Sequence, residues 1–182
     1  MKTQMALIAT LLIPLAAGPL AAGEAPLPSP TSEAAWTHAL ARPEYKGPDP
    51  CAQHSKGVCV ADNYRPRAQA LARFRTDADA IDPQYNPALD ELGRALQKGL
   101  ADAVLNIHGH ADSTGGEDHN LALSQRRAAA VRAYLMERFG IEPERLTPVA
   151  HGEAAPVADN ATEEGRRQNR RVEFERVGLW IR

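Results

Sequence analysis

Apolar residues between positions 67 and 177 follow two alternating spacings, and each spacing predicts a different kind of element. At 70–74 apolar side chains recur at every second residue, which is typical of a strand with one buried face. From Asn86-Pro87 to Leu100 leucines recur at helical spacing, and a proline suits the first turn of a helix. The same patterns predict five further elements: strands over 103–108, 146–150 and 171–177, a long helix over 117–139, and a helical turn near 162–168.

Strands that alternate with helices in this order predict an α/β fold, in the form of an α+β sandwich of βαβαβαβ order. We expect about four strands, with the helices packed on one side of the sheet. The roughly 115 residues from 67 to 182 suit one domain of this kind.

Residues 1–23 have the pattern of a secretory signal peptide: a positive start at Lys2, an apolar run over 6–17 and small residues at 21–23. We therefore expect export to the periplasm. Without this segment the chain has 20 Lys and Arg (21 less Lys2) against 23 Asp and Glu, a net charge of −3. Because a nucleic-acid binder would show a basic excess or a basic face, this balance argues against that class.

Residues 24–66 are rich in proline and show no clear periodicity, so we expect an extended or loosely ordered segment before the domain. Cys51 and Cys59 lie within it. In an exported protein an even pair of cysteines indicates a disulfide more than a metal site or a reactive thiol. By exclusion, this segment is our candidate for binding a protein partner.

The stretch from His108 to Arg127 holds the candidate chemistry. It leaves a strand at Gly109, passes a polar loop that contains Asp112, and enters the long helix. Such a loop is held by rigid elements on both sides, and the helix start offers free N–H groups. Asn120 and Arg127 are seven residues apart, which is nearly two helical turns, so both can face the loop. The pattern predicts a ligand site with Asp112 at its mouth.

A series of short motifs extends over about 71–177. In chain order they are Gly109-His110-Ala111-Asp112 with Gly115, Asn120, Leu123-Ser124 with Arg127-Ala128, Gly152-Glu153, Pro156, Asn160 with Thr162, and Gly165-Arg166 with Asn169-Arg170-Arg171-Val172-Glu173. Together, in this order and spacing, they resemble the OmpA-like peptidoglycan-binding domain, which outer-membrane protein A shares with the peptidoglycan-associated lipoprotein and flagellar stator proteins. Three positions depart from the family's usual residues: Ala111, His119 and His151.

The resemblance implies a domain that binds the peptide stem of the cell wall without cleaving it, by gripping diaminopimelate. Asp112 and Arg127 occupy the positions that would make the main ionic contacts. The exposed end of diaminopimelate carries an ammonium and a carboxylate, which a carboxylate beside a guanidinium complements. Asn120 would contact the ligand or orient Arg127, whereas Asn169 and Arg170 would be structural supports or secondary contacts.

Other functions remain open from the sequence. Asp112 could simply cap the helix or its preceding turn. The spacing His108-x-His110-x-Asp112 opens the zinc motif of metallo-hydrolases, although Ser113 stands where that motif requires a further histidine. An OmpA-like domain that has lost wall binding is the third alternative.

The run 166–171 contains four arginines, which could suggest a polyanion site. Glutamates at 163, 164, 173 and 175 flank it, so we expect structural ion pairs instead. We therefore expect a periplasmic, non-enzymatic module without a cofactor that tethers an envelope component to peptidoglycan.

Overall fold

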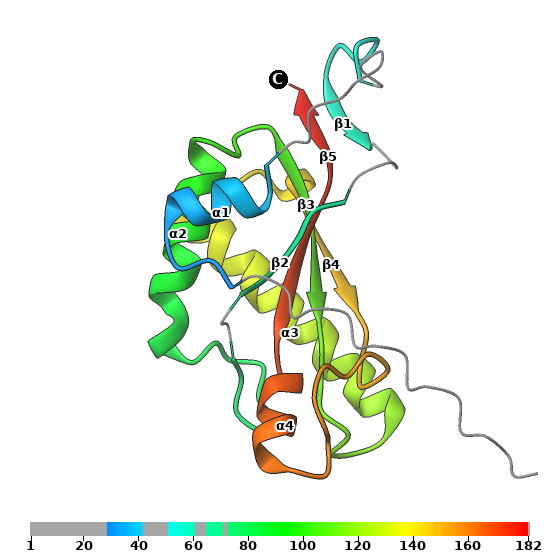
Figure 1. The fold of residues 1–182 in the computed structure, drawn as a ribbon. Helices are drawn as coiled ribbons and strands as arrows, with labels where there is room; N and C mark the ends of the chain where they lie inside the picture. Colours follow the sequence, from blue (N-terminus) through cyan, green and yellow to red (C-terminus); the bar gives the residue numbers. More distant parts are fainter. Residues whose placement is uncertain (1–28, 42–50, 61–64, 71–72, 182) are drawn as a thin grey trace, which may run out of the picture.

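The computed structural model describes residues 29–41, 51–60, 65–70 and 73–181 (Figure 1). The expected signal peptide at 1–23 lies outside these residues. Among the described residues, no helix combines the length and the apolar character that crossing a membrane requires.

The sheet has the strand order β1-β5-β3-β4, and β2 also pairs with β5. β3 and β4 are parallel, whereas β5 runs antiparallel to β1, β2 and β3. A parallel pair needs a long crossover, which here includes α3. The strands are β1 (Gly57–Val60), β2 (Arg67–Ala70), β3 (Ala103–Gly109), β4 (Leu146–Ala150) and β5 (Val172–Ile181).

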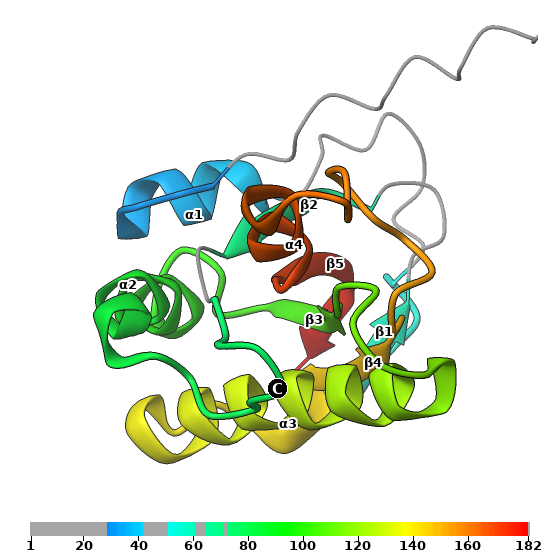
Figure 2. The same ribbon diagram turned by 90° about the horizontal axis from the view of Figure 1, so that it is seen from below.

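The three helices that the sequence predicts are present in the expected order, and the α/β architecture is confirmed. They are α1 (Glu33–Ala39), α2 (Asn86–Gln97), α3 (Glu117–Phe139) and α4 (Glu163–Asn169), with single 3-10 turns at Pro83–Tyr85 and Pro143–Arg145. Residues from α1, α2 and α3 join one buried cluster against the sheet, and Figure 2 shows these helices beside it. α4 lies at the end of the sheet away from β1 (Figure 1).

The two faces of the sheet differ in polarity because side chains alternate along each strand. Leu105, Ile107 and Phe174 are fully buried toward the helices. The residues that alternate with them along the strands, such as His108 and Glu173, lie on the opposite face and form a polar layer. The helical face therefore supplies the apolar core.

Two expectations about the start of the chain were wrong. The strand expected over 70–74 corresponds to β2 at 67–70, and residues 73–75 are not in a strand. The described part of 24–66 is also more ordered than expected, because it contains α1 and β1. Trp36 of α1 has no exposed surface, and its ring packs edge-on against Phe174 at 5.5 Å between centroids. One tryptophan thus anchors a short helix whose own sequence shows no clear period.

Cys51 and Cys59 form a disulfide, as expected. The bond joins the turn at Cys51 to β1, which pairs with the last residues of β5. A fifth strand is thereby added to the roughly four that the sequence predicts.

Candidate functional site

The candidate site lies where β3 ends, beside the start of α3. Gly109 is required there because a Cβ atom would lie 2.1 Å from the carbonyl oxygen of Ser124 on α3. The chain then continues across the end of the sheet. The amide of His110 donates to Arg171, and that of Ala111 donates to Gly152. These backbone bonds fix the direction in which the next residue, Asp112, points.

Asp112 is 4% exposed, and both of its carboxylate oxygens have partners. Nη1 of Arg170 donates to Oδ2 at 2.6 Å, and the amide of Thr114 donates to Oδ1 at 2.9 Å. Burial alone would raise the pKa of this carboxyl. The bonds from Arg170 and Thr114 outweigh burial and hold the pKa below its usual value. Asp112 is therefore a fixed negative charge at neutral pH.

Arg127 is fully buried, and its guanidinium is held by backbone carbonyls. Nε donates to Ala78 at 2.9 Å, Nη1 to His110 at 3.1 Å and Nη2 to Arg75 at 3.1 Å. The ring of Phe74 lies below it, 5.1 Å from the guanidinium carbon. Burial lowers the pKa of Arg127 to about 10, so the group stays charged at neutral pH. Because each guanidinium NH2 group has two hydrogens, N–H groups remain for a ligand.

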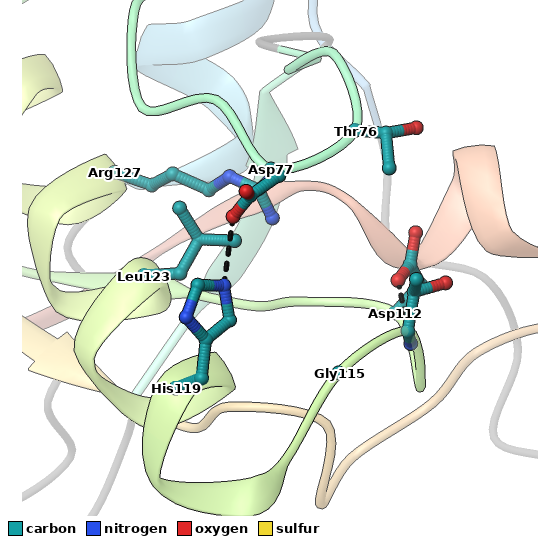
Figure 3. A pocket seen from close by; sticks show the side chains of 8 residues that line it. Thr76, Asp77, Asp112, Gly115, His119, Leu123 and Arg127 are labelled. Carbon is teal, nitrogen blue, oxygen red and sulfur yellow. Dashed lines mark hydrogen bonds and ion pairs between the residues drawn. The ribbon is translucent and has the colours of Figure 1, made fainter.

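A pocket of about 150 Å³ contains both charges (Figure 3). Its lining residues are Thr76, Asp77, Asp112, Thr114, Gly115, His119, Leu123 and Arg127. Arg127 and Leu123 come from α3, and Asp112 faces them from the loop after β3 (Figure 3). The structure thus brings the two residues expected to make the ionic contacts into one cavity.

The segment at 76–77 forms a wall of the pocket that the sequence did not assign. Oδ1 of Asp77 lies 2.7 Å from Nε2 of His119, and Figure 3 shows this bridge at the pocket edge. Asp77 has φ of 54°, a left-handed conformation that few residues other than glycine adopt. A polar run after an alternating strand signals a turn, but it does not show that the turn folds back over α3.

The three remaining expected residues bind mainly other side chains and backbone groups of the protein. Asn120 donates to Glu153, and its Oδ1 has no partner. Oδ1 of Asn169 accepts from the amides of Val157 and Ala158, so this side chain supports the loop before α4. Arg170 binds Asp112 and also donates to Glu163 at 2.8 Å.

The arginines at 166–171 form ion pairs, as expected. Arg166 pairs with Glu163, Arg167 with Glu164 and Arg171 with Glu173. The run is thus largely neutralised by its own neighbours.

The histidines expected to share one strand face do so, but Asp112 does not join them. Nδ1 of His108 lies 2.8 Å from Nε2 of His151, and the ring of His110 stacks on that of His151. Asp112 binds Arg170 instead. Within the described ranges, no group of three or more His, Cys, Asp or Glu side chains is placed to hold a metal ion.

Sequence comparison identifies the family to which this arrangement belongs. Residues 73–170, more than half of the chain, match the OmpA family. The chain belongs to the OmpA family. It is 36% identical to outer membrane protein A of Bordetella avium over 146 residues, which are 80% of this chain and 74% of that protein.

Other known proteins are also similar to much of the chain. The peptidoglycan-associated lipoprotein of Pseudomonas aeruginosa is 36% identical over 117 residues, 64% of this chain and 68% of that protein. The solved cell wall anchor of the T6SS from Pseudomonas aeruginosa is 29% identical with a TM-score of 0.53, covering 66% of this chain and 87% of that one. The chain spans only 38% of the length of outer membrane porin F from Pseudomonas aeruginosa.

Proposed function

We propose that this OmpA-family chain binds peptidoglycan non-covalently and without catalysis, and so tethers an envelope component to the cell wall. The observation that carries the proposal is the pocket that holds Asp112 and Arg127 as opposite, fixed charges. Support comes from relatives named a peptidoglycan-associated lipoprotein and a cell wall anchor. We place the protein in the periplasm, with residues 24–66 as the candidate partner-binding segment, and we expect no cofactor.

We further propose that the ligand group is the free end of diaminopimelate. A pocket of about 150 Å³ is smaller than the roughly 300–1,000 Å³ typical of sites for drug-sized ligands. It therefore suits the end of a side chain rather than a whole sugar. The carboxylate of diaminopimelate would meet the remaining N–H groups of Arg127, and its ammonium would meet Asp112. An ionised carboxylate has about four lone-pair sites, so Asp112 can accept beyond its bonds to Arg170 and Thr114.

Fixed charges favour binding because little ordering remains to be done when the ligand arrives. Arg127 is held by three carbonyls, and Asp112 by Arg170 and an amide. Asn120, Asn169 and Arg170 serve in this proposal as supports that keep the loops in place. In this proposal two side chains thus contact the ligand, and several other groups hold these two side chains in place.

The test is retention of the protein on purified diaminopimelate-type peptidoglycan, with lysine-type peptidoglycan as the second matrix. Asp112→Ala and Arg127→Ala should each lose about 2–5 kcal/mol of binding, because each leaves an opposite charge of the ligand unpaired. Asp79→Ala and Arg126→Ala are matched controls. These residues pair with each other at 2.8 Å on the surface beside the pocket, and both are about half exposed.

Circular dichroism must first establish that each variant is folded. Wild-type retention on both matrices would support wall binding but contradict selection of diaminopimelate. Equal retention of wild type and both site variants would place binding elsewhere. Failure of the wild type to bind either matrix would contradict the proposed function.

A further inference from the structure

Three histidines lie together on the polar face of the sheet, outside the pocket. His108 and His110 come from β3 and the residue that follows it, and His151 directly follows β4. The rings of His110 and His151 are stacked, with 4.8 Å between centroids and 6° between planes. His108 and His110 are 7% and 2% exposed. Three ionisable rings are thus held in contact, of which two are buried and His151 is half-buried.

The partners of His108 determine where the protons lie. Its Nε2 is 3.2 Å from the carboxylate of Glu175, which can only accept, so Nε2 carries a hydrogen. In the neutral ring Nδ1 is then an acceptor. The bond of 2.8 Å between His108 Nδ1 and His151 Nε2 therefore uses a hydrogen on His151. A single added proton can be shared, because His151 can move its hydrogen to Nδ1 and then accept at Nε2. When both rings are protonated, two donors face each other across this bond.

Charged side chains of β2, β5 and the residues beside these strands surround the rings. β2 contributes Arg67, which binds Glu173 of β5 at 2.7 Å, and Arg171 binds the same glutamate. Glu175 of β5 faces His108, with Arg65 4.0 Å from that carboxylate. The carboxylates that would stabilise an imidazolium are therefore shared with arginines. Burial, followed by the charge of Arg67, lowers the pKa of both His108 and His151.

The backbone at His151 connects this cluster to the candidate site. The amide of His151 donates to Gly109, and the next residue, Gly152, accepts from the amide of Ala111 at 2.8 Å. Gly152 also donates to Oγ of Ser124 at 2.9 Å. Ala111 directly precedes Asp112 in the chain.

Little movement is possible in this segment without loss of these bonds. A Cβ atom on Gly152 would lie 3.2 Å from the amide nitrogen of Leu121 on α3. Glu153 accepts from Asn120, which ties the same segment to the candidate site. A shift of His151 is thus transmitted to the loop that carries Asp112.

We propose that the His108–His151 pair is an acid-sensitive lock, which holds residues 151–153 against the Asp112 loop at neutral pH and releases them when both rings are protonated. Its effect on wall binding rests on the proposed function, whereas the lock itself needs no ligand. Coupled to two protons, an affinity or an opening equilibrium changes at most about a hundredfold per pH unit.

The test combines ring titration by NMR with amide hydrogen exchange from about pH 7.5 to about pH 4.5, corrected for the intrinsic pH dependence of exchange. We expect the rings of His108 and His151 to titrate below about pH 6.5, the usual value for histidine. The amides of Ala111, His151 and Gly152 should lose at least about tenfold in protection as they do so. In His108→Gln and His151→Gln this acid-induced loss should be absent. His54 is exposed and lies outside the cluster, so His54→Gln is the control and should behave as wild type.

Unchanged protection of the three amides in acidified wild type would overturn the lock. The same loss in both cluster variants would also overturn it, as would titration of His108 and His151 at or above about pH 6.5. If a variant fails to fold, the wild-type titration and exchange still decide the outcome. None of these measurements contains peptidoglycan, so failure of wall binding would remove the proposed function and leave the lock standing.

Discussion

Nη1 of Arg170 lies 2.6 Å from Oδ2 of Asp112, so the carboxylate at the mouth of the pocket is paired within the protein. The guanidinium of Arg127 is held separately, by carbonyls of Arg75, Ala78 and His110. The two charges that we propose to bind one ligand thus have different direct partners. Their surroundings still meet, because Nε of Arg170 also donates to the carbonyl of Phe74, next to Arg75.

Removal of Arg170 should strongly destabilise the fold. In Arg170→Met the buried carboxylate of Asp112 loses its partner, and breaking a buried pair from one side typically costs about 3–5 kcal/mol. We expect the free energy of unfolding in urea to fall by this amount. Arg167→Met is the matched control, because Arg167 and Glu164 are both more than half exposed and such a pair contributes less than about 1 kcal/mol. Equal losses in both variants would contradict this account.

Stability should fall in mild acid because of His110. Burial, with Arg171 as the next cause, lowers the pKa of His110 to about 2, against about 6.5 in an unfolded chain. Below pH about 6.5 the unfolded state binds a proton that the folded state does not, so the free energy of unfolding decreases as pH falls. The slope for one group reaches about 1.4 kcal/mol per pH unit.

Urea unfolding at several values between about pH 4.5 and 6.5, above the usual carboxyl range, measures this slope. His110→Phe should reduce the slope, and His54→Gln, a substitution at an exposed position, is the control. A slope that is the same in wild type and His110→Phe would show that His110 does not contribute.

The left-handed backbone at Asp77 should restrict which residues are tolerated there. Asp77 has φ of 54°, which asparagine and glycine adopt readily and β-branched residues do not. Asp77→Val should cost about 1–3 kcal/mol of stability. Asp77→Asn and Asp77→Gly should stay within about 1 kcal/mol of wild type, because the bridge from Asp77 to His119 is exposed. Thermal unfolding of the three variants compares them, and equal stability of the valine and asparagine variants would argue against strain.

Trp36 should contribute to stability as a core residue. It is fully buried against Phe174, and removal of a buried tryptophan side chain costs about 3–5 kcal/mol. Leu121→Ala is the control, since Leu121 is 48% exposed. Urea unfolding should show a large loss for Trp36→Ala and a small one for Leu121→Ala. Equal small losses would mean that α1 is dispensable to the domain.

The parts of the fold that the sequence predicts well are those with long periodic patterns. α3 was expected over 117–139 and has these bounds, and Gly140 ends it in a left-handed conformation. α1 was missed because it has only seven residues and depends on Trp36 meeting Phe174, which is 138 positions later in the chain. The strand expected over 70–74 is misplaced because a buried apolar residue such as Phe74 can also lie outside a strand.

The candidate site was predictable in its residues more than in its contacts. Motif spacing indicated Asp112 and Arg127, and both line the pocket. The spacing could not show that Arg170 holds Asp112, because that contact joins residues 58 positions apart. His151 departs from the family's usual residue at its position. Its pairing with His108, like that of Arg170 with Asp112, depends on the tertiary structure.

The strand order has a consequence for how the protein is made. β5 lies between β3 and the strands β1 and β2, yet it is the last of the five along the chain. Until β5 has been synthesised, β1, β2 and one edge of β3 lack their partner, and only β3 and β4 can pair with each other. The complete sheet therefore forms only after the last of its five strands has been synthesised.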